Sequence, residues 1–301
     1  MFLNLDMEKA FDKMEWGLIL AIMERLGFNP TWINWIRICI STSSFSILLN
    51  GSPFGHFTSE RGLRQGDPLS PFLFILGSEV LSRLLFKEES LGNIKGLKIP
   101  RNNPAINHLL FADDLLIFGK ANPKEASCIK TYLEKYCLWS GQSINNGKSS
   151  IRFSKNTNPI TAAKILDIIL FFTNTSNSIY LSLPILFGNS KKEAFQSIID
   201  KVSSKVEGWR AKTLSQVGRL TLIKSVAAAI PSYAMSTFLL PLNICRRLDR
   251  IFKNFWWGFL PTKTRNLFLK SWNSLCIPKA LGGLGLRKMQ DVNLALISKL
   301  G

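Results

Sequence analysis

Two adjacent aspartates interrupt an apolar stretch, and they restrict the fold more than any other feature of this chain. Asp113 and Asp114 stand between two strand-like runs, Leu109–Phe111 and Leu115–Phe118, which a tight turn would join into a hairpin. Burying a bare carboxylate is costly unless a cation pairs with it, whereas an aspartate in an ordinary turn is solvated. This stretch alone is compatible with both interpretations.

A third aspartate favours the cation-binding interpretation. Asp6 follows the short strand expected at Phe2–Leu5, so one strand end and one hairpin tip can converge on a single point. Mg²⁺ prefers carboxylate oxygens together with substrate phosphates. Two metal ions about 4 Å apart are the usual arrangement for in-line phosphoryl displacement. We therefore expect Asp6, Asp113 and Asp114 to lie close enough to share two ions, with Mn²⁺ as an alternative to Mg²⁺.

A glycine-containing loop supplies a further candidate site. Gly62 and Gly66 permit close approach of the backbone, and Arg64 and Gln65 place a cation and an amide at the start of the following helix. Helix N-termini favour anions, so this loop suits a phosphate-bearing ligand. The alternative is an ordinary loop in which Asp67 caps the helix.

The pattern of elements predicts an α+β fold. We expect a hairpin at 45–58 turning through Gly51–Pro53, and a strand at 151–153. Helices are expected at 15–26, from 30, and at 68–87, 123–139, 160–171, 190–207, 213–230 and 243–257. No apolar run reaches the roughly 18 residues of a membrane-spanning helix. The five cysteines form no CxxC pair, which predicts reduced thiols inside a cell.

Charge is distributed very unevenly along the chain. Residues 1–150 hold 16 basic and 14 acidic side chains, whereas residues 151–301 hold 22 and 6. Basic residues recur on two of the expected helices: Lys191, Lys192, Lys201 and Lys205 on the first, and Arg246, Arg247, Arg250 and Lys253 on the second. Such lysines are usually only solvated, but the scarcity of balancing acids favours a nucleic-acid partner.

Four motifs in this order resemble the reverse transcriptase of plant-type non-LTR (LINE-type) retrotransposons. Residues 6–12 are similar to polymerase motif A, 62–71 to motif B, 111–114 to motif C and 140–149 to motif D. The resemblance continues through 180–184, 207–209, 212–216, 218–219, 255–258 and 282–285, and so covers essentially the whole chain. It implies an antiparallel polymerase palm with packed helices at 1–155, a connection with the primer grip at 156–189, and a basic helical thumb at 190–301.

The resemblance also implies residue roles. Asp6 and Asp113 would ligate both metals with Asp114 beside them, and Lys148 would protonate the leaving pyrophosphate. Phe11 would exclude a ribose 2′-hydroxyl, although such a ring is alternatively simple core filler. The remaining implied sites are the nucleotide contacts Arg64, Gln65 and Gly66, the primer grip Tyr180, Leu181 and Ser182, and the thumb cations given above.

The implied function is RNA-directed DNA synthesis, in which a primer 3′-hydroxyl attacks a deoxynucleoside triphosphate opposite an RNA template. No membrane is expected; the sequence does not fix the compartment, for which the resemblance favours the nucleus. Because the match begins at motif A, we expect a truncated form with the fingers largely missing, acting alone or with a chain that supplies fingers and endonuclease. One alternative is a catalytically dead remnant that at most binds nucleic acid. An organellar intron maturase shares the palm, but the residues after Trp209 argue against it.

Overall fold

The computed structural model describes residues 1–98, 105–169, 179–180, 183–184, 195–209, 213–259 and 268–299. The chain divides into two compact units, Met1–Leu181 and Ser182–Gly301. Each unit has its own hydrophobic core. The finer boundaries expected at residues 155 and 189 stay predictions.

A four-stranded antiparallel sheet organises the first unit. Its strand order is β4 (His108–Phe111), β5 (Asp114–Phe118), β1 (Phe2–Asp6) and β6 (Ser150–Arg152). Together with the helices packed on it, this sheet confirms the expected α+β class. Register pairs Phe2 with Phe118 and Asp6 with Asp114. The central strand β1 therefore carries its acid at the same end of the sheet as the turn between β4 and β5.

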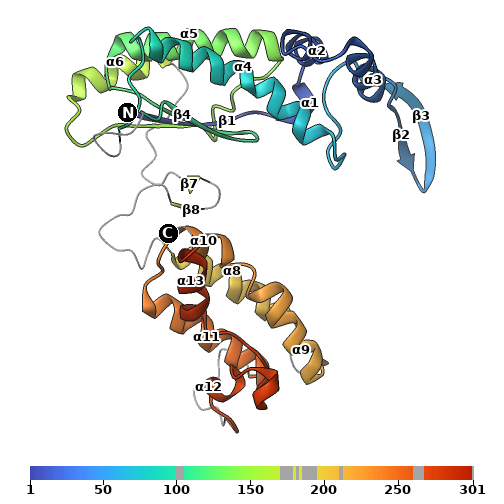
Figure 1. Ribbon diagram of the computed structural model, residues 1–301, viewed down its shortest axis with the longest axis vertical. Helices are drawn as coiled ribbons and strands as arrows, with labels where there is room; N and C mark the ends of the chain where they lie inside the picture. The colour runs from blue at the N-terminus through green and yellow to red at the C-terminus, as the bar shows by residue number, and fades with distance from the viewer. Residues whose placement is uncertain are drawn as a thin grey trace. The chain divides into compact units, whose positions relative to one another are not determined.

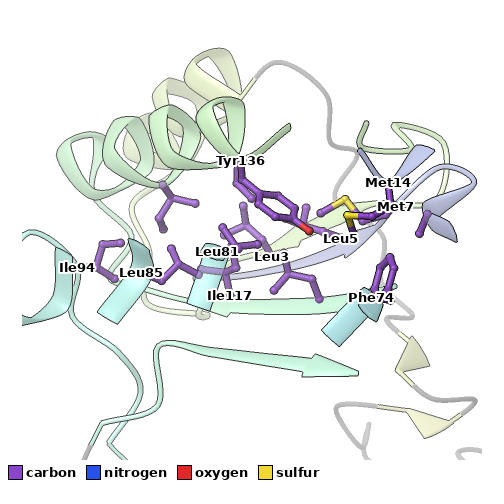
Figure 2. Packing of buried hydrophobic residues seen from close by; sticks show 14 of the residues in the cluster. Leu3, Leu5, Met7, Met14, Phe74, Leu81, Leu85, Ile94, Ile117 and Tyr136 are labelled. Carbon is purple, nitrogen blue, oxygen red and sulfur yellow. The ribbon is translucent and has the colours of Figure 1, made fainter. Parts of the chain in front are cut away.

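Helices cover one face of this sheet. These are α4 (Ser70–Ser90), α5 (Pro123–Ser140) and α6 (Pro159–Ile169). Leu3 and Leu5 of β1 are completely buried on that face, where they gather with Leu81 of α4 and Tyr136 of α5 (Figures 1 and 2). Alternation along β1 leaves Asp6 on the opposite face, partly exposed. The period-2 pattern thus separates the core from the candidate site.

The segment between β1 and α4 projects a hairpin away from the sheet. It contains α1 (Ala10–Lys13), α2 (Trp16–Arg25), α3 (Pro30–Ser41), β2 (Ser44–Leu49) and β3 (Ser52–Thr58). The expected hairpin is confirmed, but its turn lies at Asn50 and Gly51, with φ of 50° and 83°. Positive φ at both central positions is the Asn-Gly turn signature, so the expected turn at Gly51–Pro53 is wrong.

Short helices build the second unit. They are α8 (Gln196–Glu207), α9 (Gln216–Leu222), the π-helical segment η2 (Ile223–Ala227), α10 (Ser232–Thr237), α11 (Leu242–Trp256), α12 (Trp272–Leu275), the 3₁₀ turn η3 (Lys279–Leu281) and α13 (Met289–Ile297). The single helix expected at 213–230 is therefore wrong, because α9 passes into a π-helix at Ile223. Trp209, Trp256 and Trp257 pack in or against the core.

Two strands of two residues each, β7 (Ile179–Tyr180) and β8 (Leu183–Pro184), lie in the sequence where the first unit ends and the second begins. All five cysteines are free, as their spacing predicts. Within the part of the chain that the structure describes, no helix is long and apolar enough to cross a membrane.

Candidate active site

Two of the three predicted acids face each other across neighbouring strands. Asp6 is the last residue of β1 and Asp114 the first of β5, and they are direct partners in the antiparallel register. Side chains of directly opposed residues point to the same face of a sheet. Asp113 lies in the turn before Asp114, where Ala112 has a φ of 51°. The hairpin predicted from the apolar runs is confirmed.

Electrostatics couple the acids of this turn. Burial raises the pKa of Asp114 above its ordinary value, and the negative charges of Asp113 and Asp6 raise it further. The ammonium of Lys148 acts in the opposite direction. The site therefore holds an excess of negative charge that is unfavourable unless a proton or a cation offsets it.

A short loop beside β1 positions Lys148. The Asp6 carbonyl accepts a hydrogen bond from the Asn145 N–H at 2.8 Å, and the Asp6 N–H donates to Ser149 Oγ at 3.1 Å. The Asn145 side chain accepts from the N–H groups of Gly147 and Lys148, which closes a compact turn. Lys148 Nζ lies 3.8 Å from Asp6 Oδ2, with 70% of its side chain exposed. This loop therefore presents to the site the exposed ammonium of Lys148 at the end of a flexible side chain.

The glycine loop docks against the chain segment that follows β1. Gly62 N–H donates to Met14 O at 2.8 Å, and Leu63 N–H donates to Phe11 O at 2.7 Å. The indole of Trp16 donates to Gly62 O at 2.6 Å. Gly62 has a φ of +89°, and a Cβ there would lie 2.5 Å from Asp12 O. Only glycine allows these two predicted motifs to pack so closely.

Arg64 and Gln65 line a pocket of about 550 Å³ together with Asp12. Gln65 Nε2 donates to Asp12 Oδ1 at 3.3 Å. Asp67 does not cap the helix as one alternative expected: its carboxylate accepts from Leu69 N–H, and α4 begins one residue later. Gly66 has a φ of +85°. The pocket thus offers a cation, an amide and a carboxylate to one ligand.

The ring of Phe11 is both packed and accessible. It stacks on Phe74 at 4.7 Å between ring centroids, with 16° between planes. It also lines a pocket of about 390 Å³, whose other walls include Phe111 and Ala112, next to Asp113. Phe11 is therefore anchored by core contacts while one surface faces a cavity beside the acidic turn.

Sequence reasoning missed several residues of this site. Asn145 and Ser149 hold the Lys148 loop against Asp6, and Asp12 receives Gln65. An Asn two positions before a glycine, as at Asn145, is a recognisable turn signal. The contacts of Asp12 and Ser149 depend on segments far apart in the sequence, so no local pattern shows them.

The predicted metal ligands fit Mg²⁺ by their donor chemistry. Within the described residues, no three His, Cys, Asp or Glu side chains form a ready metal group, so the expected convergence of all three acids is not seen. Like-charged carboxylates repel, and Asp113 lies in the turn rather than in the strand register. One or two carboxylates nevertheless suffice when substrate phosphates complete the shell. Asp6 and Asp114 supply such a pair of oxygen donors.

The predicted thumb cations fall into two groups. Lys201 and Lys205 on α8, and Arg246 and Arg250 on α11, are exposed with four-residue spacing, so each pair shares a helix face. Arg247 instead donates to Gln196 Oε1 at 2.6 Å, and Lys253 lies over the Phe268 ring at 3.5 Å. Lys191, Lys192, Leu181 and Ser182 lie outside the described residues, and Tyr180 is half-buried in β7.

Comparison with known proteins gives a consistent assignment. A family model described as reverse transcriptase (RNA-dependent DNA polymerase) matches residues 1–162. An Arabidopsis thaliana protein named for ribonuclease H is 45% identical over 119 residues, which are 40% of this chain and 19% of that protein. An uncharacterized mitochondrial protein of the same plant is 42% identical over 106 residues, which are 35% of this chain and 86% of that protein.

A retrotransposon protein is also similar. The retrovirus-related Pol polyprotein from the type-1 retrotransposable element R2 of Popillia japonica is 35% identical over 147 residues. These are 48% of this chain and 20% of the polyprotein. The chain thus spans about a fifth of the length of two of these three relatives. The R2 match confirms the resemblance to non-LTR retrotransposon proteins that the motifs predict.

Proposed function

Because this chain belongs to the reverse transcriptase (RNA-dependent DNA polymerase) family, we propose that it extends a DNA primer by copying an RNA template. The observation that carries the proposal is the register of Asp6 opposite Asp114, with Lys148 3.8 Å from Asp6. These three residues lie within the span that matches the family model. They come from three separate segments, and their meeting at one end of the sheet supports a polymerase site.

Asp6 and Asp114 would hold Mg²⁺, with Asp113 from the adjoining turn. When bound, two such ions supply charge stabilisation at the attacking and leaving oxygens of the phosphoryl transfer. The pKa of Asp114 is raised first by burial and then by the negative charges of Asp113 and Asp6, and these neighbouring charges support the role because they favour a bound cation. Exposed Lys148 is free to reach a departing pyrophosphate and donate a proton to its oxygen.

Selection of the incoming deoxynucleotide is assigned to Phe11 and the glycine loop. Stacking on Phe74 holds the Phe11 ring in place. A ribose 2′-hydroxyl that approached the Phe11 ring would therefore clash with it, because the ring cannot move away. Arg64 presents a guanidinium to phosphate oxygens at the rim of the 550 Å³ pocket. Gln65 and Gly66 complete the nucleotide contacts in this proposal.

The second unit would hold an RNA–DNA duplex through exposed cations. Lys201, Lys205, Arg246 and Arg250 are available for phosphate contacts, whereas Arg247 and Lys253 are engaged by Gln196 and Phe268. We therefore assign the first four to duplex binding. Tyr180 remains the described residue of the proposed primer grip.

Primer extension tests the proposal. The substrate is poly(rA) annealed to oligo(dT) with Mg²⁺ and dTTP, and the variant is Asp113→Asn. The matched control is Asp167→Asn, which removes an exposed acid of α6 on the same unit. We expect the Asp113 variant to lose at least about 100-fold in extension rate while the control keeps the wild-type rate.

Duplex binding separates the alternatives. We expect the Asp113 variant to bind the duplex as tightly as wild type, because phosphate contacts lie on other residues. Wild-type protein that binds the duplex without extending it would indicate a non-catalytic nucleic-acid-binding protein. Extension that persists unchanged in the Asp113 variant would refute the assignment of the acids.

A further inference from the structure

A second group of basic side chains surrounds the glycine-rich turn Gly282–Gly285, apart from the cations of α8 and α11. Lys224 comes from the π-helical segment η2, Lys279 begins η3, and Arg287 follows the turn. All three side chains are exposed. Two stretches distant in sequence, η2 and residues 279–287, thus bring three cations to one place on the second unit.

Direct contacts fix this arrangement. Lys224 Nζ donates a hydrogen bond to Leu284 O at 2.6 Å. A Cβ on Gly285, whose φ is +61°, would lie 3.4 Å from Lys224 Nζ and 3.6 Å from Lys279 Cγ. Both lysines therefore border the same glycine, and the ammonium of Lys224 keeps two of its three donors for other partners.

The turn is rigid, and its backbone donors are already used. Leu284 N–H donates to Leu275 O at 3.1 Å, and Gly285 N–H donates to Ile277 O at 2.9 Å. A Cβ on Gly283 would lie 1.9 Å from Ile277 O, so that position requires glycine. The binding capacity of this surface consequently lies in the side chains rather than in a nest of amides.

Among the described residues, no acid lies within ion-pair distance of Lys224, Lys279 or Arg287. Burial, followed by the positive charges of Lys279 and Arg287, lowers the pKa of Lys224. Among the described residues of the second unit, none forms a salt bridge; the ion pairs of the described chain lie in the first unit. Like charges held together without a counter-ion favour an anionic ligand. A π-helical turn, as at Lys224, frequently occurs at functional sites.

We propose that Lys224, Lys279 and Arg287 form a binding site for the phosphate backbone of a polynucleotide, an inference that rests on the proposed function. An exposed surface suits a continuous chain of phosphates, since a small anion gains most from an enclosed cavity. Residues 182–301 hold 19 basic and 5 acidic side chains, which supports a long polyanion as the ligand. The glycine-rich turn serves as the rigid platform that spaces the three cations.

Salt-dependent duplex binding tests the site. The probe is a fluorescein-labelled RNA–DNA hybrid of about 20 base pairs, titrated with full-length protein by anisotropy at several salt concentrations. The variant is the double substitution Lys279→Gln and Arg287→Gln, which leaves the Lys224 hydrogen bond intact. The matched control is Lys120→Gln with Lys124→Gln, two exposed lysines beyond Phe118, at the end of β5 remote from Asp114.

We expect the slope of log affinity against log salt to shrink by about 1.5 to 2 in the double variant, and its Kd to rise about 30-fold at 0.1 M salt. The control is expected to match wild type, and circular dichroism melts should coincide for all three proteins. A wild-type slope in the double variant, or an equal loss in the control, would overturn the site and leave the proposed function standing.

Two further results discriminate between explanations. Wild-type protein that fails to bind the hybrid at all would overturn the nucleic-acid function together with this site. Calorimetric titration with sodium phosphate alone is the second arm. Micromolar phosphate binding that the double variant loses, combined with an unchanged duplex slope, would assign the site to free phosphate and refute the polynucleotide as ligand.

Discussion

The Gly62→Ala substitution tests how the glycine loop is joined to the segment after β1. A Cβ at this position would lie 2.5 Å from Asp12 O and 3.0 Å from Asp12 C, both backbone atoms. Contacts below 3.0 Å require something to move, and neither atom belongs to a flexible side chain. The loop would therefore shift away. A shift of the loop would weaken three hydrogen bonds, those donated by Gly62 N–H, Leu63 N–H and the Trp16 indole.

The structure provides a matched control for the magnitude. Gly66 has nearly the same φ, +85°, but a Cβ there meets nothing within 4 Å. Either substitution places alanine in the left-handed region, at a cost of about 1–2 kcal/mol. Gly62→Ala additionally weakens three hydrogen bonds worth about 1 kcal/mol each. We therefore expect about 4–5 kcal/mol for Gly62→Ala and about 1–2 kcal/mol for Gly66→Ala.

Amide hydrogen exchange measured by mass spectrometry is the appropriate assay, since it reports the stability of individual segments in a two-unit chain. Peptides covering residues 59–70 should lose protection in the Gly62 variant by on the order of 100-fold more than in the Gly66 variant. Peptides from the second unit should exchange as in wild type. Equal effects of the two substitutions would refute the argument that backbone approach, rather than φ alone, requires glycine at 62.

The Asp114 carboxyl, the Lys148 ion pair and the Asn293 amide can each be tested by a single substitution. The raised pKa of Asp114 means that the folded protein loses free energy of unfolding as pH rises through that pKa. The urea midpoint of Asp114→Asn should therefore exceed that of wild type at pH 7 and match it near pH 3. Lys148→Ala should slow primer extension by about 100-fold, yet change stability by less than about 0.5 kcal/mol, because its ion pair with Asp6 is exposed. Asn293→Ala should destabilise the second unit by about 3–5 kcal/mol in thermal melts, since this buried amide makes three hydrogen bonds.

Local sequence patterns account for much of the fold. Apolar spacing and a proline in the first turn predict the start of α3 and both ends of α5 closely. In the structure, the N-cap residues Asn29 and Asn122 each accept a hydrogen bond from a backbone N–H of the first turn. The π-helical segment at 223–227 was not predictable, because a change from α to π pairing leaves no periodic mark in so short a stretch. The hairpin turn differs from the expected one because Asn50 and Gly51 adopt positive φ and close a two-residue turn, which leaves Ser52 and Pro53 in the strand.

The site was predictable to a lesser degree. The sequence predicts that Asp6, Asp113 and Asp114 converge; the antiparallel register places Asp6 opposite Asp114, whereas Asp113 lies in the turn and no group of three acids is seen among the described residues. No local pattern predicts that Ser149 receives the Asp6 N–H, or that a Gly62 side chain would meet Asp12. Both contacts join distant segments, so they follow from the packing of the whole unit rather than from any one motif.

The two units differ in the charge that their functional side chains carry: acids gather at one end of the sheet in the first unit, and basic side chains predominate in the second. In the first unit, burial and then the negative charges of Asp113 and Asp6 raise the pKa of Asp114, and under the proposed function a divalent cation offsets this charge. In the second unit, cations such as Lys224 have no acidic partner among the described residues, and under the proposal their ligand is an external polyanion. Monovalent salt weakens the second interaction through counter-ion release and leaves coordination by carboxylates largely intact. Salt should therefore act on duplex affinity, and removal of Mg²⁺ on extension rate at saturating duplex, as two independent effects.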